Sequence, residues 1–355
     1  MKIFKSISCL CLVVGLLVFM TGCPSTSNTG NPKPRGLMQF SYFDTVSYVY
    51  TYAGDSDEVF QNNCEEVFEI LSYYHQLFDI YHEYSGVTNL CTINKNAGGE
   101  AMEVDAELIE FLLYAKELYT LTGGEMNVMM GSVLRLWHDA REIASDNDPT
   151  TEAYVPSADA LAEANLHTSI TLLEIDVENS TVRITDPKAS IDVGALGKGY
   201  ATELAAKHLE DKGVNSYVLN IGGNIRIIGT KPDGAGWDTG ITNPHGDGYA
   251  AYINIANISC VTSGDYERYY TVDGVKYHHI IDKDTLMPSD YFSSITILTS
   301  NSGLADALST ALFSMSLEDG LALLENIDVE VEVLWIAKDG TQYKTEGMDK
   351  YIIKR

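Results

Sequence analysis

A glycine-rich segment around one lysine is the first feature that could carry chemistry. Residues 191–200 read IDVGALGKGY, with three glycines around Lys198. If this segment opens a helix, its glycines let the backbone approach a ligand closely, and free N–H groups can face an anion. The spacing is that of neither a Walker A loop nor a G-x-G-x-x-G motif. Taken alone, the segment fits a tight strand-to-helix turn about as well.

A second segment, ADALST at residues 305–310, offers oxygen ligands. Asp306 and Thr310 are four residues apart, so on a helix they share one face. A carboxylate and a hydroxyl on one face can bind a hard cation such as Mg²⁺. The alternative is a surface helix with an aspartate near its N-terminus, which the segment alone favours.

Two adjacent histidines follow a tyrosine-rich stretch at residues 262–282. His278 and His279 point to opposite faces if they lie in a strand, so one can enter a ligand site while the other packs. Neither has a nearby histidine or cysteine at metal-ligand spacing, which argues against zinc.

The elements that must position these residues can be read from hydrophobic periodicity. Six helices are expected, at residues 57–81, 105–121, 157–165, 197–212, 305–315 and 317–324. Strands are expected at residues 39–52, 171–177, 181–184, 217–221, 224–229, 238–241, 251–255, 269–272, 294–298 and 329–337. Helices and strands are partly segregated and the turns between strands are short. This pattern favours an α+β fold with a mainly antiparallel sheet flanked by helices.

The charge of the chain restricts its partners. The 355 residues carry a formal net charge of −27, which repels the phosphate backbone of nucleic acid and argues against nucleic acid as a partner. A phosphate-bearing ligand would need a cation, a lysine or helix N-termini to offset this field. Cys64, Cys91 and Cys260 have no C-x-x-C spacing; buried free thiols are expected, with one disulfide as the alternative.

The N-terminus predicts export. Residues 1–22 have a basic start and a short apolar run, as in a signal peptide, and Cys23 follows Gly22 as in a bacterial lipobox. We therefore expect a lipidated Cys23, a flexible tether over residues 23–36 and one domain over residues 37–355. The protein would be exported and lipid-anchored at the outer face of a bacterial membrane, or periplasmic. Plain secretion and an uncleaved anchor are the alternatives.

Five segments taken together, in order, resemble the ApbE family, the FAD:protein FMN transferases, over about residues 40–337. The matching segments are DVGALGKGY (192–200), NIGG (220–223), TSGDY (262–266), HIID (279–282) and ADALST (305–310). The resemblance implies a T-fold-related α+β fold with the FAD site in a cleft. It also implies Mg²⁺-dependent transfer of FMN from FAD to a Ser or Thr hydroxyl of an acceptor flavoprotein, with release of AMP.

The resemblance also assigns roles to single residues. His279 matches the catalytically important histidine. The metal ligands match the Ala195 carbonyl, Asp306 and Thr310. The positions that contact FAD match Phe43, Tyr81, Glu125, Met126, Asn127, Asp192, Lys198 and Ile280. Chemically, splitting a pyrophosphate depends mainly on positioning and charge neutralisation, and His279 or a carboxylate could accept the proton of the acceptor hydroxyl.

Three departures from the family pattern concern the site. Residues 283–286 read KDTL where the family commonly has Pro-x-Thr-Gly, and Asn127 and Asn224 stand where Asp is usual. The cation ligands are unaffected. Two other activities remain open: an FAD pyrophosphatase that yields FMN and AMP, and a lipoprotein that binds FAD without turnover. Tyr81 favours transfer over hydrolysis.

Overall fold

The computed structural model describes residues 34–145 and 152–354, all within one compact unit. The predicted signal peptide, Cys23 and most of the tether lie outside these residues. None of the helices in the described ranges is long and apolar enough to cross a membrane.

An eight-stranded sheet forms the centre of the fold, and every pair of neighbouring strands is antiparallel. Its strands, in spatial order, are β1 (Arg35–Tyr42), β2 (Thr45–Thr51), β6 (Tyr217–Ile221), β7 (Asn224–Ile228), β10 (Ser259–Gly264), β13 (Phe292–Thr299), β14 (Val331–Ala337) and β15 (Gln342–Lys344). All eight residues of β13 are buried, because this strand lies in the interior of the sheet with layers on both faces. The sheet confirms the predicted α+β class.

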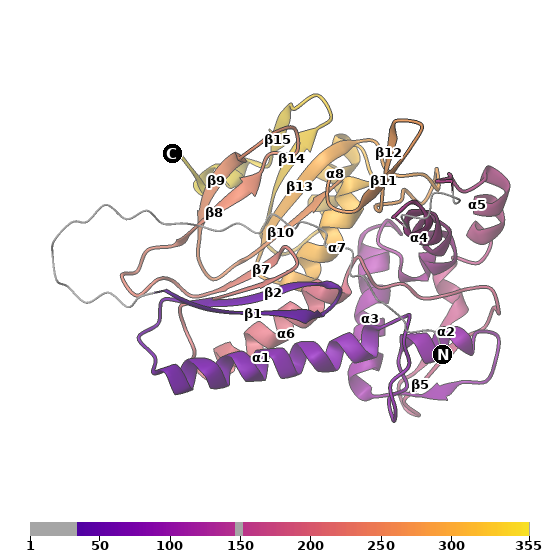
Figure 1. The fold of residues 1–355 in the computed structure, drawn as a ribbon, viewed down its shortest axis with the longest axis horizontal. Coiled ribbons are helices and arrows are strands. Elements are labelled where there is room, and N and C mark those ends of the chain that lie inside the picture. Colours follow the sequence, from indigo (N-terminus) through magenta and orange to yellow (C-terminus); the bar gives the residue numbers. More distant parts are fainter. Residues whose placement is uncertain (1–33, 146–151, 355) are drawn as a thin grey trace, which may run out of the picture. The chain divides into compact units, whose positions relative to one another are not determined.

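Three helices cover one face of this sheet: α1 (Asp57–Phe78), α6 (Gly197–Asp211) and α7 (Ser302–Phe313) (Figure 1). The side chain of Ser56 accepts a hydrogen bond from Val59 N–H and caps α1, and the apolar stripe of this helix faces the core. Asn301 caps α7 in the same way. Because α7 contacts α6 on one side and β10 and β13 on the other, most of its residues are buried.

A smaller sheet covers part of the opposite face. It consists of β16 (Ile352–Ile353), β9 (Tyr249–Ile255) and β8 (Trp237–Thr242) in that order. Its buried side chains, including Ile241 and Ile253, form a separate cluster with Ile227 and Leu298 of the large sheet. The short helix η3 (Glu346–Lys350) leads into β16 and adds Met348 to the same cluster.

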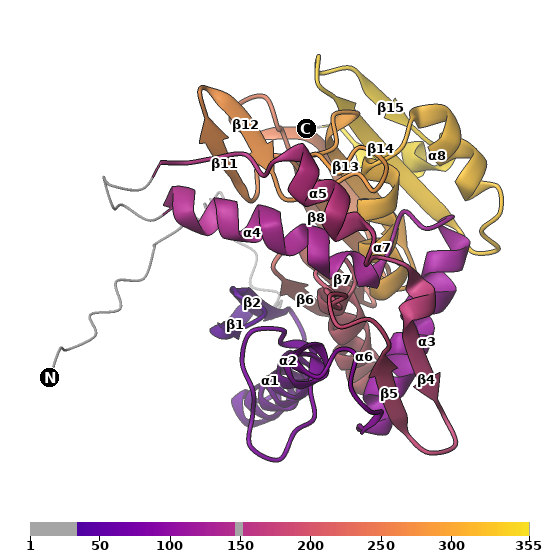
Figure 2. The same ribbon diagram turned by 90° about the vertical axis from the view of Figure 1, so that its right-hand side faces the viewer.

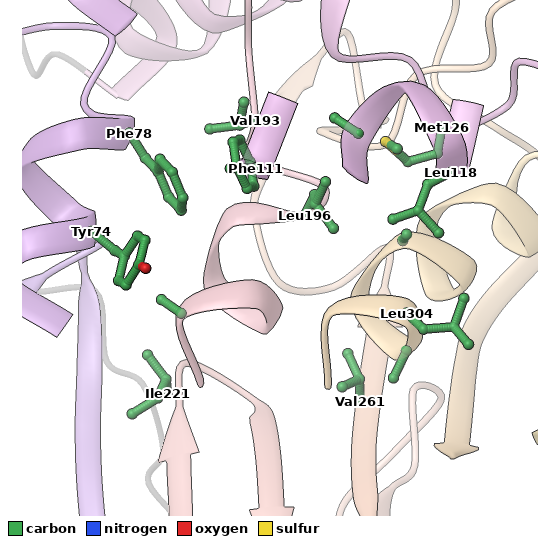
Figure 3. Packing of buried hydrophobic residues seen from close by; sticks show 14 of the residues in the cluster. Tyr74, Phe78, Phe111, Leu118, Met126, Val193, Leu196, Ile221, Val261 and Leu304 are labelled. Carbon is green, nitrogen blue, oxygen red and sulfur yellow. The ribbon is translucent and has the colours of Figure 1, made fainter. Parts of the chain in front are cut away.

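The remaining elements form the side of the domain that faces the viewer in Figure 2. Its helices are α2 (Leu90–Lys95), α3 (Ala106–Leu121), η1 (Val128–Met130), α4 (Gly131–Ser145), α5 (Ala158–Asn165), η2 (Ile170–Leu172) and α8 (Leu317–Leu324). Its strands are β3 (Met102–Glu103), β4 (Leu173–Asp176), β5 (Thr181–Ile184), β11 (Tyr269–Val272) and β12 (Val275–His278). Figure 3 shows Phe78 of α1, Phe111 of α3 and Leu196 before α6 in the large core that joins α2, α3, β4 and β5 to the central sheet. Helices α4 and α5 share a separate cluster with β11 and β12.

The structure corrects one predicted element, and it contains others that were not predicted, among them β10 in the large sheet. Residues 39–52 were expected to form one strand, but β1 and β2 make a hairpin whose turn holds Phe43 and Asp44 at positive φ of 54° and 50°. Helix α4 was not predicted. The cysteine prediction is confirmed, since Cys64, Cys91 and Cys260 are buried free thiols.

Candidate active site

The glycine-rich segment forms the N-terminus of α6, as the sequence predicted. Asn94 fixes its start, because the side-chain amide donates to the Ile191 carbonyl (2.9 Å) and accepts from Ile191 N–H (2.7 Å). The Asp192 carboxylate accepts from Gly194 N–H at 2.9 Å, and the Lys198 ammonium lies 3.1 Å from the Gly194 carbonyl. The segment is therefore a tight turn held by its own polar groups, with one lysine at the helix entrance.

Helix α7 places Asp306 directly against this turn. The buried Asp306 carboxylate accepts a hydrogen bond from Gly199 N–H at 2.8 Å. In a regular helix that N–H would bond to the carbonyl four residues earlier, which is Ala195. The Ala195 carbonyl oxygen has no hydrogen-bond donor among the described residues. Thr310, half-buried, lies one turn after Asp306 on the same helix.

The two histidines divide as the strand spacing predicted. His278, the last residue of β12, is buried: its Nδ1 accepts from Ile280 N–H and its Nε2 donates to the Ser289 carbonyl at 2.8 Å. His279 is half-buried, and both its backbone N–H and its Nδ1 lie within 3.2 Å of the Arg268 carbonyl. Because the carbonyl can only accept, Nδ1 carries the proton and Nε2 has a free lone pair.

The surroundings of His279 favour its neutral form. Burial lowers its pKa well below the usual 6.5, and the nearby charges of Arg268 and Lys198 lower it further. Burial also raises the pKa of Asp192, against the opposing effect of the Gly194 hydrogen bond. A neutral imidazole with a free nitrogen can accept a proton at neutral pH.

Two of the predicted nucleotide contacts, Phe43 and Tyr81, lie in the β1–β2 turn and just after α1. Phe43 occupies the turn, and its backbone N–H donates to Nδ1 of His75 at 3.2 Å. Tyr81 exposes 42 % of its surface just after α1, and Asp79 holds its backbone N–H at 2.7 Å. Burial of the hydroxyl and the nearby Asp192 raise the pKa of Tyr81 to about 12.

Residues 125–127 form a bend after α3, and their side chains differ in how far they are exposed to solvent. The Glu125 carboxylate lies 3.2 Å from the Lys283 ammonium, and burial raises its pKa. Met126 is buried, with its N–H bonded to the Thr122 hydroxyl, so its side chain belongs to the core. Asn127 donates from its side-chain amide to the Thr168 carbonyl at 2.9 Å. A carboxylate at position 127 could not make that bond, which accounts for asparagine there.

Ile280 is a core residue in the structure. Its side chain is 4 % exposed, its N–H bonds to His278, and its carbonyl accepts from Ser289 N–H at 2.9 Å. The structure thus shows Ile280 fixing the backbone directly after His279. Its role as a nucleotide contact stays a prediction.

The turn after the histidines closes without the proline and glycine of the family pattern. The Asp282 carboxylate accepts from the N–H groups of Asp284 and Thr285 at 2.8 and 2.9 Å. Leu286 then takes a positive φ of 60°, a conformation that favours glycine, while its side chain is buried among residues of α4 and α5.

Sequence reasoning missed His138 and Arg141, which α4 brings next to Tyr81. The Tyr81 hydroxyl lies 3.5 Å from Nδ1 of His138, and the Arg141 guanidinium 2.9 Å from the same nitrogen. The helical spacing of Val133, Trp137 and Ala140 was a signal that could have located this helix. A cavity of about 750 Å³ beside the C-terminal end of α6 is lined by none of the predicted site residues.

A neutral histidine, a lysine at a helix N-terminus and a buried aspartate in one region are features of an enzyme of phosphate chemistry rather than of plain packing. The sequence profile described as "ApbE family" matches residues 43–335, and the chain belongs to this family.

Named relatives agree with this membership. The chain is 30 % identical to an FAD:protein FMN transferase of Treponema pallidum over 94 % of this chain and 92 % of that one. It is 29 % identical to the FAD:protein FMN transferase of Vibrio cholerae over 76 % of this chain and 80 % of that one. The crystal structure of the ApbE protein of Thermotoga maritima superposes with a TM-score of 0.78 at 29 % identity, covering 91 % of this chain and all of that one.

Proposed function

We propose that this protein transfers FMN from FAD to a Ser or Thr hydroxyl of an exported or membrane-bound acceptor flavoprotein, releases AMP and requires Mg²⁺. The observation that carries the proposal is the bond between Asp306 and Gly199 N–H. It joins the carboxylate on α7 to the glycine-rich entrance of α6 and leaves the Ala195 carbonyl without a donor. The names of the relatives support flavin transfer as the activity.

The ligands suit Mg²⁺. The described residues hold no group of three or more His, Cys, Asp or Glu side chains that could bind a metal ion, so a cation site here depends on mixed oxygen ligands. The Ala195 carbonyl, the Asp306 carboxylate and the Thr310 hydroxyl would supply them, and Mg²⁺ prefers oxygen. Bound there, Mg²⁺ would neutralise charge on the pyrophosphate of FAD, which the net charge of −27 otherwise repels.

The chain's own residues provide the remaining steps. Lys198, at the positive end of α6, would hold a phosphate oxygen. Nε2 of His279 would take the proton of the acceptor hydroxyl while the hydroxyl oxygen forms a bond to the FMN phosphorus. The bond from that phosphorus to the AMP oxygen breaks in the same exchange, and AMP leaves with the bridging oxygen.

The cellular location is proposed from the N-terminal sequence. We infer removal of residues 1–22, lipidation of Cys23 and display of the domain on the outer face of a bacterial membrane. An acceptor in the same compartment would then be reached without crossing the membrane.

Incubation of the full-length protein with FAD, Mg²⁺ and a flavoprotein acceptor tests the function. AMP together with a fluorescent acceptor band on a denaturing gel supports transfer. AMP with free FMN identifies a pyrophosphatase, and bound but unchanged FAD identifies a carrier. Either of the last two results overturns the proposal.

A further inference from the structure

Three cations near the candidate site have no carboxylate partner among the described residues. Most lysines and arginines in the described ranges form a salt bridge, as the Arg226–Glu210 and Lys276–Asp265 pairs do. Lys198, Arg141 and Arg268 form none with any described residue. In a chain with 50 acidic and 23 basic residues, a group of cations that pair with no described carboxylate needs a reason.

Helix α4 packs against the β11–β12 hairpin (Figure 2), and this contact brings the two arginines into the same region. The Trp137 indole N–H donates to the Leu286 carbonyl at 2.9 Å, and its ring lies 6.5 Å from that of Tyr270. Arg141 comes one turn after Trp137, and Arg268 comes directly before β11. Both arginines therefore lie on well-packed backbone.

His138 holds Arg141 in place. A guanidinium can only donate, so Nδ1 of His138 accepts from Arg141 at 2.9 Å and must be unprotonated. Burial and the Arg141 charge both lower the pKa of His138, which keeps that acceptor available. The His138 ring lies 5.2 Å from the Tyr81 ring, so Arg141 is fixed beside a predicted nucleotide contact.

Arg268 is fixed from the other side. Its carbonyl accepts from His279 N–H at 3.0 Å. Burial and then the charge of Arg268 lower the pKa of Arg141, which means that the two guanidinium groups repel each other. Negative groups also face them: Asp192 and Glu142 act on Arg141, and Glu267 acts on Arg268, without forming a salt bridge to either. An anion bound between the two arginines would relieve the repulsion.

We propose that Arg141 and Arg268 form an anion subsite that binds a phosphate group of the dinucleotide, with His138 as the residue that positions Arg141. The planar guanidinium fork matches a phosphate in two parallel hydrogen bonds, which an ammonium cannot do. This inference rests on the proposed function. The two arginines would add positive charge beside the pyrophosphate, in addition to the charge expected from Lys198 and Mg²⁺.

Paired ligands that differ by one phosphate test the subsite. Affinities of the full-length protein for FMN against riboflavin, and for AMP against adenosine, are measured by competition with FAD fluorescence. In wild type, the phosphate of at least one pair should strengthen binding. Arg141→Gln and Arg268→Gln should each weaken FAD binding about 10-fold to 100-fold, the loss typical of one charged hydrogen-bonding partner.

Arg141→Gln and Arg268→Gln should reduce the gain in affinity that the phosphate gives in wild type. The affinities for riboflavin and adenosine, which have no phosphate, should stay within about twofold of the wild-type values. Arg141→Lys, which keeps the charge without the fork, should recover part of the FAD affinity. Lys350→Gln is the control, because Lys350 lies on η3, is exposed and pairs with Glu330 at 2.8 Å. It removes the same charge and should change nothing.

Three results would overturn the subsite: no phosphate advantage in either wild-type pair, unchanged FAD affinity in both arginine variants, or equal losses for ligands with and without phosphate. Far-ultraviolet circular dichroism of Arg141→Lys and Arg268→Gln separates a folding defect from a binding defect. If the wild type does not bind FAD, the proposed function itself fails. If it binds and turns over FAD while the arginine variants behave like wild type, only the subsite fails.

Discussion

The backbone N–H of Gly199 donates to the buried carboxylate of Asp306 at 2.8 Å, across the contact between α6 and α7. A Cβ on Gly199 would lie 2.4 Å from the Asp306 Cβ and equally close to the Ser302 carbonyl. Glycine is therefore required for the two helices to approach. The carboxylate also replaces the Ala195 carbonyl as acceptor, so one contact shapes two of the three predicted oxygen ligands.

Gly199→Ala should disrupt this contact. The added methyl would meet backbone and Cβ atoms, which move less easily than the end of a side chain, and should lower the free energy of unfolding by about 1–3 kcal/mol. FAD turnover should fall at the same time, because α7 must shift away from α6. Urea unfolding and AMP release measure both effects. Gly54→Ala, with no heavy atom within 4 Å, is the control; equal losses in both variants would contradict the argument.

Asp306→Asn should separate the charge from the fold. The amide oxygen can still accept from Gly199 N–H and the side-chain size is kept, so we expect an almost unchanged melting temperature. The lost negative charge should raise the Mg²⁺ concentration for half-maximal activity about tenfold or more. Asp57→Asn removes the same charge from a side chain that is 98 % exposed and should leave the Mg²⁺ titration unchanged. An unchanged titration in Asp306→Asn would remove this residue from the metal site.

Local patterns in the sequence predicted much of the fold, but not its long-range contacts. The periodicity from Phe60 to Phe78 predicted α1 because one face of this helix is buried. The turn at Phe43 and Asp44 was missed because it holds no glycine or asparagine, the usual residues at positive φ. The helix and the turn are both local structures. Such structures can be predicted from sequence only where they are built from the residue types usual for them.

The candidate site shows the same division. The motifs identified Lys198, Asp306 and His279, but Gly199 and Asp306 are 107 positions apart and their hydrogen bond cannot be read from spacing. Arg141 was missed because the site depends on α4 docking against a hairpin more than 120 positions further along. Sequence patterns therefore gave the chemistry of the site, and tertiary packing gives its geometry.

Substitutions of Leu286 should reverse the usual preference for alanine over glycine. Both Leu286→Ala and Leu286→Gly lose a buried side chain, but only glycine adopts the positive φ of 60° without strain. We expect the glycine variant to be more stable than the alanine variant by about 1 kcal/mol. At Leu113, inside α3, alanine should instead exceed glycine by about 1 kcal/mol. Urea unfolding of the four variants checks the sign, and the same order at both positions would contradict it.

Cys23→Ser should abolish the proposed anchor. The intact protein, expressed in a bacterium that modifies lipoproteins, should sediment with membranes and have a mature mass above that of residues 23–355. The excess mass is that of the attached acyl and glyceryl groups, whose burial holds the protein on the bilayer by about 0.8 kcal/mol per methylene. Cys64→Ser, at a buried free thiol, should keep both properties. A wild-type mass equal to that of the unmodified chain would refute lipidation.

The pH dependence of kcat/KM should report the depressed pKa of His279. Burial and the charges of Arg268 and Lys198 lower this pKa below the usual 6.5, so the neutral, proton-accepting form persists in mildly acidic solution. The acidic limb should therefore lie below pH 6.5. Arg268→Gln removes one of the positive charges, raises the pKa of His279 and should move the limb to higher pH, whatever its effect on FAD affinity.

His279→Ala should lower kcat about 100-fold to 10,000-fold and abolish the limb. Arg135→Gln removes a positive charge that is paired with Asp139 and should leave the limb in place. A limb that stays fixed in Arg268→Gln, or persists in His279→Ala, would assign the proton transfer to another group.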